Sequence, residues 1–328
     1  MRRVRHMITA LTLAGLTGAI LAAIPGPAQG QAPSQPQPYL AIDQDFPDPA
    51  LLPARGRYYA YSTNADGKNM PVASADGLYG AWTIKGEGLP ILGPWASVGF
   101  TWAPDVTALD DDSYIVYYTA RHTASGRQCI GAARSASPAG PFTPVGDTAL
   151  ICPTQEGGAI DAAAFVDADN TRYITYKNDG NAIGLPTYLY LQRVAADGLT
   201  MIGKPVRTMQ NDPSTEGGLI EAPYLVRHQG RYYMFYSYGQ WWNETYTTTY
   251  AVASSLAGPW TKATQPLMTT RSLNGSAIGP GGASFLTGGK QGDVVAFHGV
   301  RNVPSFHRGM YIAQLDWRGA TPVVKVKP

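Results

Sequence analysis

Tyr58-Tyr59-Ala60-Tyr61 is a short run of residues that favour β-strands, and the chain repeats this kind of run four more times. The steps from one run to the next are 56, 59, 60 and 61 residues. The later runs are Tyr114-Ile115-Val116-Tyr117, Tyr173-Ile174-Thr175-Tyr176, Tyr233-Met234-Phe235-Tyr236 and Val294-Val295-Ala296-Phe297. A strand-rich repeat of this length is typical of the blades of a β-propeller.

Each run lies inside a larger unit that also repeats. A turn such as Arg55-Gly56 or Gln229-Gly230 precedes the run, and a motif such as Gly140-Pro141-Phe142-Thr143 or Gly258-Pro259-Trp260-Thr261 follows later. Each unit therefore contains three or four short strands. We predict an all-β fold, a five-bladed β-propeller, that forms a single domain over residues 39–328. A two-sheet sandwich is the alternative, but it would not give five copies in phase.

The composition agrees with a β-protein that is rich in turns. Among 328 residues there are 37 Gly, 26 Pro and 20 Tyr, and only 15% are charged. Gly and Pro favour turns, and Tyr favours pleated strands. A helical bundle would be richer in Ala, Glu, Lys and Leu, and a disordered chain would have fewer apolar and aromatic residues. Both classes are therefore excluded.

Residues 1–30 have the features of a secretory signal peptide, with a signal anchor as the alternative. Arg2, Arg3 and Arg5 precede an apolar segment over residues 7–24, and Ala28-Gln29-Gly30 offers small residues for cleavage. We expect a secreted protein, extracellular or periplasmic, with a flexible lead-in over residues 31–38. Removing the three arginines changes the formal net charge from +2 to −1. This near-neutral charge does not support a nucleic-acid partner, and no later segment is apolar for long enough to span a membrane, so we expect neither a nucleic-acid nor a membrane partner. We also expect a monomer.

The two cysteines, Cys129 and Cys152, have no neighbouring His or Cys in the sequence. This spacing does not resemble a metal site. Outside the cytoplasm such a pair favours a disulfide, with two buried thiols as the alternative.

Four acidic residues lie at similar places in the first four units. They are Asp48, Asp105, Asp161 and Glu221, separated by 57, 56 and 60 residues. In a propeller such residues would meet near one end of the central channel. Carboxylates that meet raise one another's pKa, so that one can keep a proton while another stays ionised. Glycoside hydrolysis needs two carboxyl groups in these two states. The alternative is that the acids cap turns at the blade starts, most of all for Asp105.

His298 follows the fifth run directly, at a position that should face the channel. A neutral imidazole there could hold a water or an ion, or it could be an ordinary core histidine.

These motifs together are similar to those of a known family. In order along the chain they are Pro47-Asp48-Pro49, Trp102-Ala103-Pro104-Asp105, Ile160-Asp161, Ile220-Glu221-Ala222-Pro223, Gly279-Pro280-Gly281-Gly282 and Phe297-His298. From Phe46 to about Trp317 the chain resembles glycoside hydrolase family 43. Members are five-bladed propeller enzymes that act on arabinose- and xylose-containing polysaccharides.

The resemblance implies a role for each matching residue. Asp48 corresponds to the general base, Glu221 to the general acid, and Asp161 to the residue that raises the pKa of the acid and orients it. The family inverts the anomeric configuration. His298 corresponds to a channel histidine that helps to hold a calcium or other ion through water, so calcium is a candidate cofactor. Arg308 lies where many members have an arginine that contacts the sugar.

Aromatic residues near these motifs are candidates for stacking on sugar rings. Trp102 and Phe100 are expected to bind substrate, and Trp241 and Trp242 could either do so or pack between blades. One departure from the family lies in unit five, where many members have Gly-His-Asn and this chain has Gly281-Gly282-Ala283.

The sequence therefore predicts a secreted, inverting glycosidase that acts on arabinan, arabinoxylan or xylan. Arabinofuranosidase, arabinanase and β-xylosidase activities all share the three acids. A catalytically inactive carbohydrate-binding propeller is an alternative, but it would lack at least one of them. A retaining fructosidase is another, but its Asn-Asp-Pro motif occurs here only as Asn211-Asp212-Pro213, in the wrong unit.

Overall fold

The computed structural model describes residues 38–302 and 304–326 of the chain. These residues belong to one compact unit, Gln35–Pro328. The signal peptide predicted for residues 1–30 lies outside the described residues, and so does the lead-in predicted for residues 31–38, apart from its last residue. Within the described residues, no helix is both long enough and apolar enough to cross a membrane.

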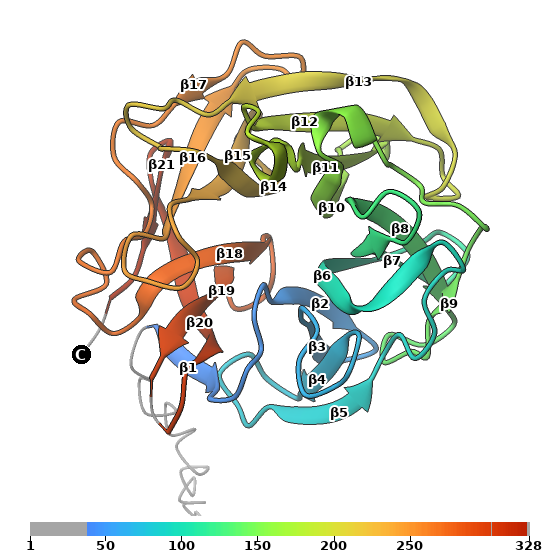
Figure 1. Ribbon diagram of the computed structural model, residues 1–328. Helices are drawn as coiled ribbons and strands as arrows, with labels where there is room; N and C mark the ends of the chain where they lie inside the picture. Colours follow the sequence, from blue (N-terminus) through green and yellow to red (C-terminus); the bar gives the residue numbers. More distant parts are fainter. Residues whose placement is uncertain (1–37, 303, 327–328) are drawn as a thin grey trace, which may run out of the picture. The chain divides into compact units, whose positions relative to one another are not determined.

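The described chain consists mainly of β-strands, which form five antiparallel sheets around a central opening (Figure 1). Each sheet corresponds to one repeat unit, and we call the sheets blades 1 to 5. The predicted all-β, five-bladed propeller is therefore confirmed.

The strands of the five blades have the following bounds. Blade 1 contains β2 (Ala50–Ala54), β3 (Arg57–Tyr61), β4 (Pro71–Ala75) and β5 (Thr83–Glu87). Blade 2 contains β6 (Ala96–Ala108), β7 (Tyr114–His122), β8 (Gln128–Ser135) and β9 (Thr143–Pro144). Blade 3 contains β10 (Ala159–Val166), β11 (Arg172–Asn178), β12 (Tyr188–Val194) and β13 (Met201–Gln210). Blade 4 contains β14 (Ile220–His228), β15 (Arg231–Tyr238), β16 (Thr247–Ala253) and β17 (Thr261–Lys262). Blade 5 contains β18 (Ile278–Leu286), β19 (Asp293–Arg301), β20 (His307–Arg318), β1 (Tyr39–Ile42) and β21 (Thr321–Val324).

Two short 3₁₀ helices belong to connections around blade 3. They are η1 (Thr154–Glu156), before β10, and η2 (Gly180–Ile183), between β11 and β12. The strands β2, β6, β10, β14 and β18 lie nearest the centre, and consecutive members of this set contact one another (Figure 1). The Tyr-rich runs form the second strands, β3, β7, β11, β15 and β19. Residues that begin the first strands therefore meet near the axis.

The ring is closed by strands from both ends of the described chain. β1 pairs with the first part of β20, where Leu40 lies opposite Tyr311. β21 pairs with the second part of β20, where Leu315 lies opposite Val324. The sheet of the last blade thus includes the strand that precedes blade 1, and this pairing joins blade 5 to the start of the chain.

A backbone kink recurs once in every blade. One residue within or just before each first strand has a positive φ at an equivalent place, and the five are Asp48 (51°), Ala103 (38°), Asp161 (58°), Ala222 (51°) and Gly282 (58°). The strand ladders of blades 2 to 5 shift register at or directly beside these residues. For residues other than glycine this conformation costs roughly 1–2 kcal/mol, so the surrounding structure must hold it in place.

A side chain of the preceding blade accepts a hydrogen bond from each kinked backbone N–H. The acceptors, from Asp48 onward, are His298 Nδ1, Thr63 Oγ1, Thr119 Oγ1, Asp161 Oδ2 and Ser237 Oγ. These bonds link each blade to the next all the way around the ring. The kinks also define which residues are equivalent. Glu221 precedes the kink of its blade by one residue, and Asp105 follows its kink by two.

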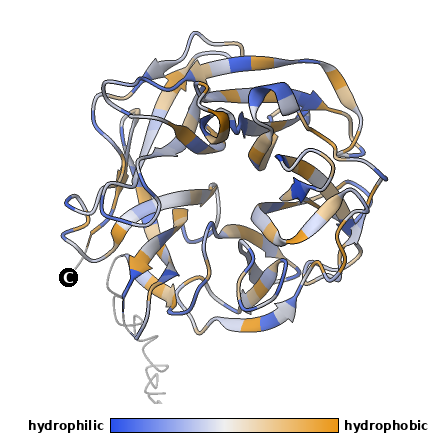
Figure 2. Ribbon diagram, in the orientation of Figure 1, coloured by the Kyte–Doolittle hydropathy of each residue, from blue (hydrophilic) through white to orange (hydrophobic). Residues whose placement is uncertain are grey.

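Apolar side chains are buried mainly between neighbouring blades. Each of the five hydrophobic clusters in the described residues combines side chains of two adjacent blades. Tyr61 of blade 1, for example, packs edge-on against Phe142 of blade 2 at a ring distance of 6.3 Å. Figure 2 shows hydrophobic residues along the strands of every blade. One blade cannot bury both faces of its sheet, and the ring supplies the missing cover.

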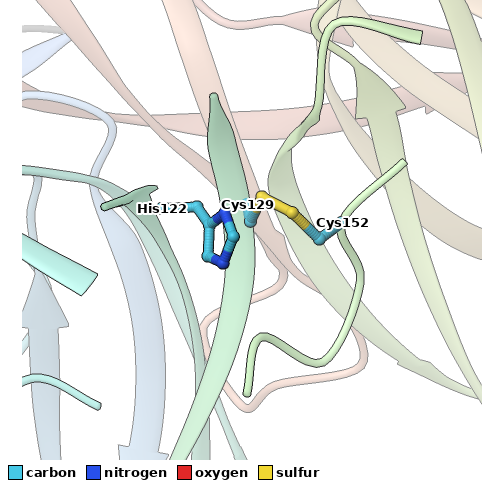
Figure 3. Close-up of side chains that lie close together, drawn as sticks. All are labelled: His122, Cys129 and Cys152. Carbon is cyan, nitrogen blue, oxygen red and sulfur yellow. A yellow bond between two sulfur atoms is a disulfide. The ribbon is translucent and has the colours of Figure 1, made fainter. Parts of the chain in front are cut away.

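The predicted disulfide between Cys129 and Cys152 is present (Figure 3). It joins β8, which contains Cys129, to the segment after β9, which contains Cys152. It closes a loop with a sequence separation of 23 residues, for which chain entropy gives a stabilisation of about 3 kcal/mol. His122 lies beside the pair. Because both sulfurs are bonded to each other, this group does not form a metal site.

Candidate active site

Asp48 lies at the kink that precedes β2, and its carboxylate is surrounded by positive and donating groups. Thr63 Oγ1 donates a hydrogen bond to Oδ2 over 2.6 Å, and Arg308 Nη1 lies 3.5 Å from the same oxygen. Nδ1 of His298 lies 3.1 Å from Oδ1. Burial acts to raise the pKa of Asp48, but the charge of Arg308 and the hydrogen bond from Thr63 act against it, and the pKa lies well below its usual range. The structure thus keeps this carboxyl ionised.

Asp161 occupies the equivalent kink in β10, where its surroundings have the opposite effect. Its Oδ2 accepts a hydrogen bond from the Ala222 backbone over 2.9 Å, which places the carboxyl beside Glu221. Burial raises the pKa of Asp161, and the neighbouring Glu221 charge raises it further. The two acids lie together at the junction of blades 3 and 4, so they cannot both ionise easily.

Glu221 is the second residue of β14, and two groups hold its carboxyl. Tyr246 Oη donates a hydrogen bond to Oε1 over 2.8 Å, and Lys177 Nζ lies 3.6 Å from Oε2. Burial raises the pKa of Glu221, while Lys177 and Tyr246 act to lower it. Burial prevails, so this carboxyl retains a proton to higher pH than an exposed glutamate does.

These acids line one cavity of about 660 Å³. Six of the seven predicted site residues contribute to its wall: Asp48, Asp161, Glu221, Trp102, Phe100 and Arg308. The cavity is large enough for a sugar unit and its neighbour, and it combines aromatic faces with convergent polar groups. Carboxyl groups kept in opposite protonation states in one cavity can perform general acid–base chemistry.

Asp105 does not line the large cavity, although it lines a smaller pocket of the channel together with Asp48 and Asp161. The expectation that four carboxylates meet at one place is therefore met in part, because three of the four line each pocket and Glu221 shares neither pocket with Asp105. The residue lies two positions beyond the kink, away from the large cavity, and is buried. Its Oδ2 accepts a hydrogen bond from the Ala164 backbone over 2.8 Å, and burial raises its pKa to about 7. Asp105 therefore links blades 2 and 3, which is a structural role, but it contacts a residue inside β10 and does not cap a turn as considered from the sequence.

The predicted ion-binding residue, His298, lies behind Asp48 and does not line the large cavity. The ring is fully buried, stacks on Tyr246 at 5.4 Å, and accepts a hydrogen bond from the Asp48 N–H at Nδ1. Burial lowers the pKa of His298, so the ring is neutral and its proton resides on Nε2.

Nε2 of His298 is buried and has no hydrogen-bond partner among the described residues. An N–H group does not fit as a direct ligand of calcium, which prefers oxygen ligands, but it does fit a water. The described residues also place no group of three His, Cys, Asp or Glu ligands around His298. The side chains present thus match a water-mediated contact and not a calcium shell made of protein.

Two glycines beside the acids lie where a side chain would clash: Gly281, which matches the family motif, and Gly282, which departs from it. A Cβ atom on Gly282 would lie 2.5 Å from Asp48 Oδ1, and one on Gly281 would lie 2.1 Å from the Tyr246 ring. Both distances are far below a normal contact. Glycine at these two positions leaves the room that Asp48 and Tyr246 need.

Aromatic side chains form one edge of the cavity. Trp241 and Trp242 are 40% and 49% exposed and pack edge to face, and Phe306 lies 6.3 Å from Trp241. The Arg308 guanidinium lies 4.5 Å over the Trp241 ring while its Nη1 faces Asp48. Trp241 and Trp242 line the cavity, so the packing between blades considered from the sequence is not their position, and stacking on a sugar ring stays a prediction.

Several residues of the site were missed in the sequence. Thr63, Tyr246, Lys177 and Asp179 all contact the acids or their partners. Lys177 has a signal in the sequence, because it follows a Tyr-rich run as His298 does. Tyr246 has none, because it belongs to the irregular connection between β15 and β16.

Several known glycoside hydrolases are similar to this chain in sequence. The family described as Glycosyl hydrolases family 43 matches residues 40–322. The "Probable arabinan endo-1,5-alpha-L-arabinosidase A" of Aspergillus flavus is 31% identical over 196 residues, which cover 58% of this chain and 57% of that protein. The chain thus matches less than two thirds of this relative's length. The beta-D-galactofuranosidase xynD of Aspergillus niger is 24% identical, with 86% and 82% covered.

Solved structures have the same architecture. The crystal structure of a thermostable family-43 glycoside hydrolase has a TM-score of 0.79 and 29% identity, and the match covers 90% of this chain and 96% of that one. The endo-arabinase from Bacteroides thetaiotaomicron has a TM-score of 0.70 at 20% identity, which supports the fold alone.

Proposed function

Because this chain belongs to glycosyl hydrolase family 43, we propose that it is a glycosidase that hydrolyses arabinose- or xylose-containing polysaccharides or oligosaccharides. The observation that carries the proposal is the contrast in one cavity between Asp48, whose pKa is held low, and Glu221, whose pKa is raised. Hydrolysis of a glycosidic bond needs an ionised base and a protonated acid at the same time.

In the proposed mechanism, Asp48 accepts a proton from the water that attacks the anomeric carbon. Glu221 donates its proton to the glycosidic oxygen as the C–O bond breaks, and Asp161 supports the protonated form of Glu221. A single attack by water inverts the anomeric configuration, as expected from the resemblance. Activity needs pH above the low pKa of Asp48 and below the raised pKa of Glu221. It should therefore persist into acid and decline as the pH rises through the pKa of Glu221.

The substrate is inferred from the cavity wall and from the relatives. Trp102, Trp241 and Trp242 offer flat faces for sugar rings, and Arg308 can donate hydrogen bonds to hydroxyl groups. The relatives are named as a probable arabinan endo-1,5-alpha-L-arabinosidase and a beta-D-galactofuranosidase, and the first of these names gives arabinan as the substrate. Arabinan is therefore our first choice of substrate, and xylan is the second.

The proposal is tested with nitrophenyl α-L-arabinofuranoside, nitrophenyl β-D-xyloside and debranched arabinan. We expect hydrolysis of at least one of them, and ¹H NMR of the first product should show the anomer opposite to that of the substrate. Retained configuration would contradict the inverting mechanism. Binding without hydrolysis of any substrate would instead favour the inactive carbohydrate-binding propeller.

Secretion and a monomeric state are part of the same proposal. The disulfide between Cys129 and Cys152 supports an oxidising compartment, and the sequence of the first 30 residues has the pattern of an export signal.

We also propose that calcium contacts the channel only through water held by His298. The buried Nε2 without a partner among the described residues supports this idea. If calcium contributes to the fold, chelation with EDTA should lower the melting temperature, and added calcium should restore it. The proposal would be contradicted if the purified protein contained no bound calcium and its melting temperature did not change when calcium was added.

A further inference from the structure

A lysine is fully buried beside the cavity, and the mechanism described above does not use it. Lys177 is the penultimate residue of β11, and its side chain has no exposed surface. Its Nζ donates a hydrogen bond to Asn181 Oδ1 over 2.7 Å and lies 3.7 Å from Asp179 Oδ1 and 3.6 Å from Glu221 Oε2. An ammonium group is costly to bury unless it is paired, so this arrangement needs its acidic partners.

The turn that carries Asp179 and Asn181 is held firmly in place. The Asp179 N–H donates a hydrogen bond to the Gly158 carbonyl over 2.9 Å. Gly157 packs so closely that a Cβ there would lie 2.1 Å from the Asp179 carbonyl oxygen. The Asp179 carboxyl itself is only 10% exposed. The lysine and the aspartate are thus fixed, buried parts of the cavity wall.

We propose that Lys177 and Asp179 are positioning residues for Glu221, in which the lysine holds the carboxyl against the cavity and Asp179 balances the lysine's charge. This inference rests on the proposed function, in which Glu221 is the general acid.

Charged and titratable groups face Glu221 from five segments of the chain. They are Lys177 from β11, Asp179 from the following turn, Asp161 from β10, Asp48 before β2 and Tyr246 before β16. Without Asp179, Lys177 would have Glu221 as its one acidic partner. It would then favour the ionised form of Glu221, which has no proton to donate. Burial and the charge of Asp179 act in the opposite direction, and the pKa of Glu221 is raised overall.

We expect the interaction between Lys177 and Glu221 to strengthen as the reaction proceeds. When Glu221 passes its proton to the glycosidic oxygen, the electron pair of the breaking C–O bond stays on that oxygen and Glu221 becomes a carboxylate. Lys177 Nζ, 3.6 Å away, stabilises the new negative charge without moving. An interaction that strengthens as charge develops accelerates the chemical step.

The test measures the protonation of Glu221 directly. The chain has five glutamates, Glu87, Glu156, Glu216, Glu221 and Glu244, so ¹³C NMR of protein labelled at glutamate carboxyl carbons can resolve each one. The Glu221 signal is assigned with Glu221→Gln. We expect Lys177→Met to raise the titration midpoint of Glu221, because a nearby positive charge is lost, and Asp179→Asn to lower it, because a negative charge is lost.

A matched control removes another lysine that is paired with a buried glutamate. Lys262 Nζ lies 2.5 Å from Glu216 Oε2, and neither residue lines the cavity. Lys262→Met should leave the midpoint of Glu221 unchanged. If Lys177→Met does not fold, Asp179→Asn still decides the outcome. Midpoints that stay unchanged in both variants, or that move in the same direction, would overturn the inference and leave the pair a purely structural role.

Kinetics supply the second readout and separate the two proposals. The alkaline limb of kcat/KM should move to higher pH in Lys177→Met and to lower pH in Asp179→Asn, and kcat of Lys177→Met should fall by about tenfold. Wild-type protein that is inactive on every substrate would defeat the proposed function, while the NMR titration would still decide this inference. Active wild-type protein with unmoved midpoints would defeat the inference alone.

Discussion

Replacing Glu221 with glutamine should lower kcat on debranched arabinan by about 10³-fold, within the range for loss of a general acid. The amide keeps the shape of the side chain and can still contact Tyr246, but it has no proton to give to the leaving oxygen. The loss should depend on the leaving group. A 2,4-dinitrophenyl arabinofuranoside, whose leaving group needs no proton, should be hydrolysed nearly as fast by the variant as by the wild type.

A control variant and the pH profile test this expectation further. Glu216→Gln changes another largely enclosed glutamate, which lies outside the cavity and contacts Tyr236 and Lys262. It should lower stability without any dependence on the leaving group. The alkaline limb of the pH profile should also disappear in Glu221→Gln. Full activity of Glu221→Gln on arabinan would show that another group is the acid.

Replacing Asp48 with asparagine should also lower kcat by about 10³-fold, but equally for good and poor leaving groups. The base acts on the attacking water in every case, so an activated leaving group cannot compensate. Asparagine leaves Arg308 without its ion pair at 3.5 Å, and KM should change as well if this arginine contacts the sugar. Steady-state kinetics on arabinan and on the dinitrophenyl substrate give kcat and KM.

Asp105→Asn is the matched control for Asp48→Asn. Asp105 is buried and belongs to the same repeat, but it lies outside the large cavity, and an amide oxygen can still accept the hydrogen bond from Ala164. Its kcat should stay within a few-fold of wild type. A loss in Asp105→Asn as large as that in Asp48→Asn would mean that the channel acids act together and that Asp48 is not a separate base.

The repeat made the architecture predictable from the sequence. Four Tyr-rich runs and the related run at residues 294–297, all in phase, required five similar sheets, and the first-strand acids required a meeting point near the axis. The positions of Asp48, Asp161 and Glu221 around one cavity follow from these two facts. The sequence did not reveal the backbone kink, and without it Asp105 and Glu221 appeared equivalent to Asp48. A local shift in strand register moves a side chain from one environment to another.

Other residues of the site could not be predicted because their contacts depend on connections between strands. Tyr246 reaches Glu221 from the segment before β16, and Asp179 reaches Lys177 from the turn after β11. Neither spacing follows the repeat. Such contacts depend on the conformation of each connection, and this conformation differs from blade to blade.

The closure of the ring has a consequence for the order in which the protein becomes competent. Asp48 is among the earliest of the proposed catalytic residues to be synthesised, yet His298 and Arg308, which fix its backbone and its charge, are made 250 and 260 residues later. A growing chain therefore exposes an ordinary aspartate until blade 5 has been translated and docked on blade 1. Asp48 acquires these contacts when blade 5 packs against blade 1 and closes the ring. We therefore expect a truncated or opened molecule to be inactive as well as unstable.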